Sequence, residues 1–468
     1  MNKILFTLTL FVFFSCTKTA PTITLVNNKP IIDTTTKAII TSQFQGYKVQ
    51  PFNKKDEVKY WRDCGVMWDV IADKFLIKID GKVGSYFLPQ ITVGDFNNDG
   101  WIDIFNPGTG LFKNEVVDNV GWLIWNTTTK TFDNKNLFNN KTLKSFGGNQ
   151  RRSVTLDLNK DGFSDVVIFD SGDDVPLPGT ISELQPIRIV LSDGKGGYDL
   201  KDIQTSSTIL YNHSGDIGDL NNDGYPDLVS ATGSALFISW GIANYPYFST
   251  NVTLFDLWNK SDNGFGEWFR EASGQVYNVT IGDVDKDGNE DMILGCNEMK
   301  YPSAYNLSGF DFTTKIILNQ GRGEFSKRGL INLPNYTNDN QNFLANDFRI
   351  VDINNDGLND IISTGSVNYD NWTIYTYMQT SKNSFSIDTS KFIYTINTNR
   401  KSNSIGLSWK PWLIYYDFNG DGQKDISYID AHDFWNNSLK RKTIFIRKGN
   451  NFEEDDFYKY DNYINKLK

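Results

Sequence analysis

Six short segments of this chain repeat one pattern of oxygen-bearing side chains whose spacing could hold a metal ion. Each segment has Asp at position 1, Asn or Asp at position 3, Asp-Gly at positions 5 and 6, and Asp at position 9. Calcium takes about 6–8 oxygen ligands, and carboxylates two residues apart in a tight loop can converge on one ion. The glycine at position 6 permits a sharp turn that a residue with a Cβ would resist. The six segments start at Asp95, Asp157, Asp219, Asp283, Asp352 and Asp417.

The pattern predicts up to six structural calcium ions. Positions 1, 3, 5 and 9 would bind through side chains, and position 7 through its backbone carbonyl, which leaves its residue type free to vary. Asp/Asn-rich turns occur in any β protein, but six copies that all keep the position-9 Asp favour the metal interpretation. The predicted ligands are Asp95, Asn97, Asp99, Trp101, Asp103, Asp157, Asn159, Asp161, Phe163, Asp165, Asp219, Asn221, Asp223, Tyr225, Asp227, Asp283, Asp285, Asp287, Asn289, Asp291, Asp352, Asn354, Asp356, Leu358, Asp360, Asp417, Asn419, Asp421, Gln423 and Asp425.

The segments around each loop have the composition of β-strands. An EF-hand would need Glu at position 12 and flanking helices, whereas position 12 here is Asn, Ile, Ser, Leu, Ser and Tyr. Ile-Thr-Val-Gly precedes Asp95, and Asp-Val-Val-Ile-Phe follows the second loop, which is the β-branched and aromatic pattern of strands. The unit is therefore strand, metal loop, strand.

The loops recur at an almost constant interval. Their first aspartates are 62, 62, 64, 69 and 65 residues apart, and such a period indicates a repeat architecture. About halfway through each unit comes a strand, a Gly/Asn-rich turn and an aromatic residue, as in the segments ending at Tyr198, Phe325 and Phe452. Each unit thus supplies four strands, and four-stranded sheets repeated around a ring form a β-propeller.

The combination of Asp-x-Asn-x-Asp-Gly-x-x-Asp with a downstream Asn-x-Gly-x-Gly-x-Phe hairpin resembles the FG-GAP/VCBS repeat over about residues 88–468. That repeat builds the propeller of integrin α-subunits and many bacterial cell-envelope proteins. The resemblance implies an all-β propeller with calcium-binding loops between the first two strands of six blades, and it implies little about activity.

The number of blades has two solutions. Residues 75–87 resemble the hairpin of the other units, and Asp63-Cys64-Gly65 begins a segment like a metal loop without its ligands. We therefore expect residues 42–87 to form a first blade without calcium, which gives seven blades. The alternative is six blades with an N-terminal extension. No segment has the pattern of an amphipathic helix.

The N-terminus indicates export and a lipid anchor. Residues 1–15 combine one Lys with a short apolar run, as in a signal peptide, and Cys16 follows a sequence similar to a lipoprotein lipobox. We expect lipidation of Cys16, a tether over residues 16–41 and a propeller over residues 42–468, in the cell envelope and at the outer membrane. An ordinary signal peptide with a chance cysteine is the alternative. Cys64 and Cys296 are expected as free, buried thiols.

The charge of the chain is explained by its loops. The formal net charge is -10, and 19 aspartates lie at the predicted ligand positions. Six calcium ions would offset all of this charge, so the acidity does not imply a basic partner. Nothing indicates a nucleic-acid surface, and we expect a monomer.

A ligand would bind on the face opposite the metal loops, because long connections on a rigid scaffold tend to carry binding residues. These connections hold aromatic residues that could stack on a sugar ring or contact a protein ligand, although aromatic packing between blades is the competing explanation. The candidates are Trp258, Trp268, Tyr301, Trp409 and Trp435.

A polysaccharide lyase or glycoside hydrolase on the same scaffold is the alternative function. A lyase could use His213 or His432 with Arg151 or Arg152, and a hydrolase could use a carboxylate pair such as Glu267 and Glu271. No nucleophile elbow, HExxH motif or phosphate loop occurs. The sequence therefore favours a binding protein over an enzyme.

Overall fold

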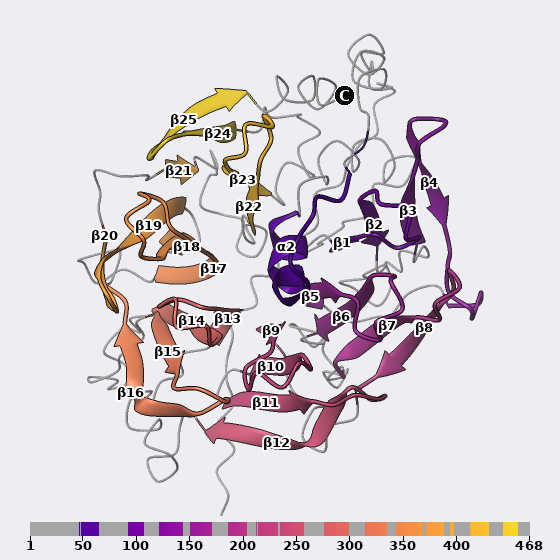
Figure 1. Ribbon diagram of the computed structural model, residues 1–468, viewed down its shortest axis with the longest axis horizontal. Helices are drawn as coiled ribbons and strands as arrows, with labels where there is room; N and C mark the ends of the chain where they lie inside the picture. Colours follow the sequence, from indigo (N-terminus) through magenta and orange to yellow (C-terminus); the bar gives the residue numbers. More distant parts are fainter. Residues whose placement is uncertain are drawn as a thin grey trace, which may run out of the picture. The chain divides into compact units, whose positions relative to one another are not determined.

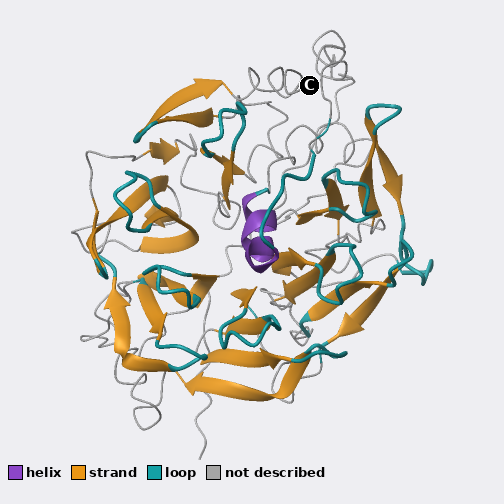
Figure 2. Cartoon of the chain, viewed as in Figure 1, coloured by secondary structure: helices purple, strands orange, loops and turns teal. Residues whose placement is uncertain are grey.

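The computed structural model describes residues 46, 48–64, 92–106, 121–143, 150–170, 186–203, 212, 214–232, 235–256, 276–298, 314–334, 343–367, 371–387, 394–396, 412–429 and 443–456 (Figure 1). Phe44–Lys468 forms one compact unit. Strands dominate the described part of this unit, and one short helix accompanies them (Figure 2).

The first three blades are four-stranded antiparallel sheets, each formed by consecutive strands. Blade 1 contains β1 (Thr92–Gly94), β2 (Asp103–Asn106), β3 (Gly121–Asn126) and β4 (Thr131–Lys135). Blade 2 contains β5 (Gln150–Leu156), β6 (Asp165–Asp170), β7 (Arg188–Ser192) and β8 (Tyr198–Asp202). Blade 3 contains β9 (Ser214–Gly218), β10 (Asp227–Thr232), β11 (Ala235–Gly241) and β12 (Phe248–Asp256).

The last three blades repeat this order, with a small join between blades 4 and 5 where β14 also pairs with β17. Blade 4 contains β13 (Val276–Gly282), β14 (Asp291–Glu298), β15 (Lys315–Asn319) and β16 (Phe325–Asn332). Blade 5 contains β17 (Phe343–Val351), β18 (Asp360–Val367), β19 (Asn371–Ser381) and β20 (Ser384–Ile387), and β21 (Tyr394–Ile396) extends its outer edge. Blade 6 contains β22 (Trp412–Tyr416), β23 (Asp425–Ile429), β24 (Thr443–Lys448) and β25 (Asn451–Asp456).

The blades are arranged around a ring with the first strand of each blade innermost (Figure 1). The inner strands β1, β5, β9, β13, β17 and β22 contact one another in that order. Hydrophobic clusters of described residues lie between consecutive blades from blade 1 to blade 6, so that these five interfaces are sheet-on-sheet cores. Between blades 1 and 2 this core is aromatic, with the rings of Trp122 and Tyr198 centred 4.9 Å apart. The β-propeller expected from the repeat is confirmed.

The preference for seven blades was wrong, and the alternative of six is correct for the described residues. The segment expected to begin an extra blade instead forms a 3-10 turn, η1 (Lys54–Asp56), and a helix, α2 (Glu57–Asp63). Asp63 and Cys64 end this helix and do not begin a degenerate metal loop. Residues 65–87, which include the expected hairpin, lie outside the described residues.

Local sequence explains why α2 starts where it does. The side chain of Asn53 caps η1 by accepting from the Lys55 N–H, and Glu57 lies in the first turn, where a carboxylate is favourable. Lys54 pairs with Glu57 at 2.7 Å. The helix has only 7 residues, so tertiary contacts must supply most of its stability.

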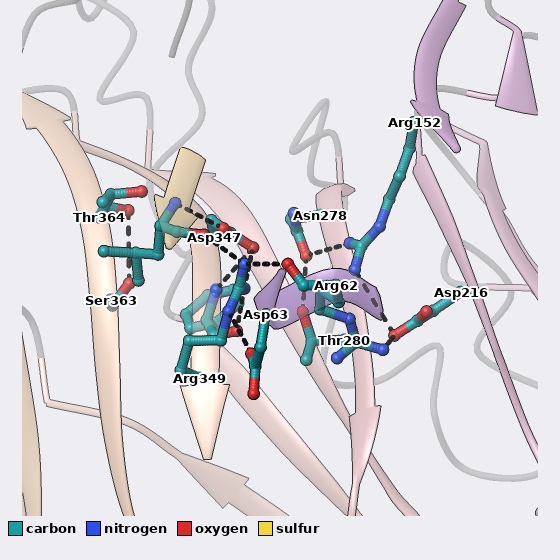
Figure 3. A network of polar contacts seen from close by, with 12 residues as sticks. Arg62, Asp63, Arg152, Asp216, Asn278, Thr280, Asp347, Arg349, Ser363 and Thr364 are labelled. Atoms are coloured by element: carbon teal, nitrogen blue, oxygen red, sulfur yellow. Dashed lines mark hydrogen bonds and ion pairs between the residues drawn. The ribbon is translucent and has the colours of Figure 1, made fainter. Parts of the chain in front are cut away.

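Those contacts place α2 in the middle of the ring, against β5 and β22 (Figure 1). Arg62 Nη2 lies 2.5 Å from Asp216 Oδ2 on β9, and Asp63 Oδ1 lies 2.9 Å from Arg349 Nε on β17. Lys424 Nζ lies 3.0 Å from the other oxygen of Asp63. Figure 3 shows Asp216 from β9 and Arg349 from β17 close to Arg62 and Asp63 at the end of the helix.

The inner strands add further buried charges to this network. Arg152 on β5 donates from Nη1 to Asn278 Oδ1 at 2.9 Å and pairs with Asp216 at 3.6 Å. Asp347 accepts from Arg349 Nη1 and from the Leu413 N–H, both at 2.9 Å. These buried pairs fix which residues of the helix face which blades.

Two smaller findings complete the fold. Cys64 is buried and free, as expected, whereas the side chain of Cys296 lies outside the described residues. Among the described residues no helix is long and apolar enough to span a bilayer.

The role of the central ion pairs in holding α2 can be tested with Asp63→Asn. This change removes one of the two buried carboxylates that pair with the Arg349 guanidinium and leaves Asp347 as the other, and we expect the free energy of unfolding to fall by about 1.5–3 kcal/mol. Urea titration followed by tryptophan fluorescence would measure it. The matched control is Asp133→Asn, which breaks the exposed pair between Asp133 and Lys135 and should cost less than about 1 kcal/mol. Equal losses in the two variants would contradict a structural role for the central network.

Candidate metal centre

The six metal loops, numbered 1 to 6 in chain order, share one set of internal hydrogen bonds. In loop 1 the Asp95 carboxylate accepts from the Asp99 N–H at 3.0 Å and from the Gly100 N–H at 2.8 Å. The equivalent pair of bonds from positions 5 and 6 to position 1 occurs in every other loop. The position-1 aspartate therefore closes each loop into a ring.

Positions 3 and 5 direct their oxygens to the same region. Asn97 Oδ1 accepts from the Asp99 N–H at 3.1 Å, beside the bond from that N–H to Asp95. Asp99 Oδ1 accepts from the Trp101 N–H at 2.9 Å. The bond from position 7 to position 5 occurs in the five other loops too. Three side chains per loop thus present oxygens around one point.

The backbone of each loop passes twice through the left-handed region. Position 6 is always glycine with φ between 81° and 94°, and in five of the six loops an added Cβ at that glycine would meet no atom within 4 Å. Backbone conformation, not crowding, therefore requires glycine. Position 4 is also left-handed, with Asn98 at φ 57° and Lys160 at φ 62°, a requirement that the repeated sequence pattern does not indicate.

The position-9 aspartate has a different environment from the other predicted ligands. It is fully buried in all six loops. Asp103 Oδ2 accepts from the Phe96 N–H at 3.1 Å, and Asp103 Oδ1 accepts from the Trp125 N–H on β3 at 2.8 Å. Both bonds recur in the other five blades. Position 9 therefore ties the loop to the third strand of its blade.

Burial raises the pKa of these carboxyl groups, because the charged form loses its hydration. It raises the pKa of Asp165 to about 8, and the pKa values of Asp227 and Asp291 to about 7. The backbone N–H groups act in the opposite direction, and the aspartates at positions 1 and 5 of the loop add to the increase in the pKa of Asp227. A divalent cation beside the loop would favour the charged form.

Loop 4 fits a calcium ion best, since it carries a carboxylate at positions 1, 3 and 5. Oxygens of Asp283, Asp285 and Asp287 all lie within 4.8 Å of one another, about twice a Ca–O distance. Asp285 Oδ1 is also buried with no hydrogen-bond partner among the described residues. An orphaned carboxylate oxygen in such a cluster is the environment a hard cation would complete.

Comparisons with known proteins agree with this repeat. The FG-GAP-like repeat model matches residues 157–230, from the start of loop 2 into β10. Integrin alpha-3 of Cricetulus griseus is 30% identical over 156 residues, which cover 32% of this chain and 14% of the integrin. The chain thus spans only a small part of that relative's length.

The chain contains an FG-GAP-like repeat and folds as a β-propeller. Among solved structures, the GH43 β-1,3-galactosidase BT3683 with galactodeoxynojirimycin is similar with a TM-score of 0.34 and 9% identity, covering 61% of this chain and 90% of that one.

Neighbouring blades of the propeller are joined at their loops by a polar group that bridges two carbonyl oxygens. Asn319 Nδ2 donates to Leu220 O in loop 3 at 2.6 Å and to Glu290 O in loop 4 at 3.0 Å. Gln379 Nε2 makes the same bridge from Val284 O to Asn359 O, one blade further on. These bridges connect position 2 of one loop with position 8 of the next.

Other residue types serve the same purpose elsewhere in the ring. The Tyr198 hydroxyl lies 2.9 Å from Phe96 O and 3.1 Å from Ser164 O, between loops 1 and 2. Arg447 Nη2 donates to Ile353 O in loop 5 at 2.8 Å. Because Asn, Gln, Tyr and Arg look unrelated in the sequence, these contacts had no recognisable signal.

The structure places few of the other predicted site residues. Trp258, Trp268, Tyr301, Trp409 and Trp435 lie outside the described residues, as do His213, His432, Glu267 and Glu271. Arg152, which the sequence offers as a candidate residue for a lyase, is buried in the central network. The roles of the residues outside the described ranges stay predictions.

Position 9 ties the loop to the sheet, whereas position 5 is a predicted metal ligand. Substitutions at these two positions should therefore change the free energy of unfolding by different amounts. Asp227→Ala removes the acceptor of the buried Leu220 and Gly241 N–H groups, and we expect it to lower the free energy of unfolding by about 2–6 kcal/mol without calcium. The exposed Asp223 at position 5 is the matched control, and Asp223→Ala should cost under about 1 kcal/mol in chelator. Urea unfolding in EDTA measures both. A loss for Asp227→Ala that appears only with calcium would contradict the structural tie.

Proposed function

We propose that this propeller is a calcium-stabilised, lipid-anchored cell-envelope protein that binds a glycan or a protein ligand through the face opposite its metal loops. The observation that carries the calcium part is loop 4, where three carboxylates converge within 4.8 Å and leave a buried oxygen without a partner. The other five loops have the same backbone hydrogen bonds with Asn at position 3. Their donor sets also suit calcium.

Calcium in this proposal braces the ring. The loops touch one another directly: Lys286 Nζ of loop 4 donates to Gly357 O of loop 5 at 2.8 Å, and Asn222 Nδ2 of loop 3 donates to Asn289 Oδ1 of loop 4 at 2.8 Å. An ion bound in each loop would order a continuous belt of contacts between blades. Six similar sites spread around a ring suit bracing better than a single reaction centre.

The ligand face follows from strand direction. Antiparallel pairing puts the metal loops and the hairpins between third and fourth strands at one end of every blade. The connections between second and third strands, and those between blades, start from the other end. The predicted aromatic residues Trp258, Trp268 and Tyr301 belong to these connections, which supports ligand binding there.

The lipid anchor rests on the sequence around Cys16. A tether over residues 16–41 would present the propeller at the membrane surface while leaving both faces accessible. Removal of residues 1–15 and lipidation of Cys16 can be checked together by mass spectrometry of the protein isolated from membranes.

Calcium should control stability. Ligand at 100 times its Kd stabilises the folded state by about 2.7 kcal/mol per site, so we expect excess EDTA to lower the melting temperature by more than about 10 °C. Differential scanning calorimetry with and without calcium measures this, and magnesium in place of calcium is the control for ionic strength. An unchanged melting curve in EDTA would overturn calcium binding.

Two substitutions test which loop binds calcium most tightly. Affinity rises with the number of charged ligands, so loop 4 should bind calcium most tightly. Asp285→Asn gives loop 4 the donor set of the other loops and should remove the tightest binding step in calorimetric titration. Asn221→Asp gives loop 3 a third carboxylate and should add a second tight step. The same titration profile in all three proteins would exclude the loops as the binding sites.

The ligand and its face can be tested on a glycan array and in pull-down assays with calcium present. We expect Trp258→Ala or Trp268→Ala to reduce binding by tenfold or more, since truncating a tryptophan at a binding hot spot costs about 2 kcal/mol or more. Tyr245→Ala is the matched control, because Tyr245 is exposed in the β11–β12 hairpin at the metal-loop end. Loss of binding only in the Tyr245 variant would place the ligand on the metal face. Release of unsaturated products or reducing ends, lost in His213 or Glu267 variants, would establish the enzymatic alternative instead.

A further inference from the structure

A small cavity lies in the middle of the ring, between α2 and the inner strands β1 and β5. Its lining includes Trp61 and Arg62 from the helix, Thr92 from β1, and Arg152, Ser153 and Thr155 from β5. The cavity offers about 20 Å³ to the centres of water-sized spheres, and one such sphere needs about 10–15 Å³. It can therefore hold a particle of one to three heavy atoms.

The cavity has a positive environment. Its described lining residues include two guanidinium groups and no carboxylate. Asp216 pairs with both arginines, at 2.5 Å from Arg62 Nη2 and 3.6 Å from Arg152 Nη2. Asp347 also attracts Arg152, and Glu290 attracts Arg62, but none of these carboxylates is among the described residues that line the cavity. Burial lowers the pKa of Arg152 to about 10, and the effects of Asp216 and Asp347 oppose this decrease.

Unused donors belong to the same residues. Arg152 is 2% exposed, and its Nε and Nη2 have no hydrogen-bond partner among the described residues. Its Nη1 is occupied by Asn278 Oδ1 and Val279 O. The indole Nε1 of Trp61 is likewise buried and without a described acceptor. Each such donor costs about 1–3 kcal/mol unless an acceptor is supplied.

Only a few kinds of hydrogen-bond acceptor suit these donors. The Nε and Nη2 atoms form one edge of the guanidinium, which can donate two parallel bonds to a carboxylate or converge on a single anion. A water molecule would accept from only part of this set. A small anion would accept from these donors and would place a negative charge in a cavity whose described lining has two guanidinium groups and no carboxylate.

We propose that this cavity binds one compact monovalent anion, a halide or a carboxylate no larger than formate, between Arg152, Arg62 and the Trp61 indole. The bound anion bridges α2 to blade 2 and thereby holds the helix in the ring. This site is separate from the calcium loops and from the ligand face, and it does not depend on the proposed function.

Two measurements on the intact protein test the site. Crystals soaked in sodium bromide should show an anomalous peak within hydrogen-bond distance of Arg152 Nε, and crystals soaked in formate should show a bidentate density on the same edge. In solution, increasing concentrations of chloride or formate should raise the melting temperature in a saturable way. Gluconate, which is too large for the cavity, would keep the ionic strength constant while the chloride or formate concentration is varied. Response to chloride alone, or to formate alone, would identify which anion the cavity takes.

A conservative variant links the effect to the cavity. Trp61→Phe keeps the ring and removes the N–H donor, and we expect the half-saturating anion concentration to rise about fivefold. The matched control is Trp122→Phe, since Trp122 is another buried indole whose Nε1 has no described acceptor, but it lies in the core between blades 1 and 2. Water alone in the cavity after bromide soaking, or no saturable anion effect in the unsubstituted protein, would overturn the proposal.

Discussion

The buried carboxylate at position 9 of each repeat is the interaction on which this propeller depends. Its two oxygens accept from a backbone N–H of the metal loop and from one on the third strand, as Asp165 does with Leu158 and Ser192. A carboxylate without partners would be too costly to bury, and one with two fixed donors locks the loop to the sheet. The loop can therefore hold its shape through the sheet, and a cation would add to an existing framework.

Contacts between blades extend this constraint around the ring. The same pair of carbonyls, at position 2 of one loop and position 8 of the next, is bridged by Asn319, Gln379 and the Tyr198 hydroxyl. The geometry repeats while the side chain changes, because any donor that reaches both oxygens satisfies them. Hydrophobic clusters between the sheets supply the bulk of the stability, and the bridges fix the register of one blade against another.

The sequence predicted the repeat unit well, because the glycine and the aspartates of each loop lie within nine residues and the loop recurs at an almost constant interval. It could not predict that position 9 is tied to a strand about twenty residues further on, since Asp looks the same as a ligand or as an acceptor. It also missed α2, whose seven residues have no extended hydrophobic period. What holds this helix is Asp216 and Arg349, which lie far away in the chain.

The position of α2 explains how a ring of blades formed in strict chain order is held together. All four strands of blade 1 precede blade 2, and all four of blade 6 come last, so among the described strands neither blade contains a strand from the other end of the chain. The segment before blade 1 connects them: the Val49 N–H donates to Gly100 O in loop 1, Gln50 Nε2 donates to the Tyr416 hydroxyl, and Asp63 pairs with Lys424. Buried ion pairs contribute less to net stability than apolar packing would, but they accept only one arrangement of partners. The charged helix in the ring centre and the residues before it therefore connect blades 1 and 6 in one defined arrangement. Closure of the propeller depends on these residues, which lie outside its repeats.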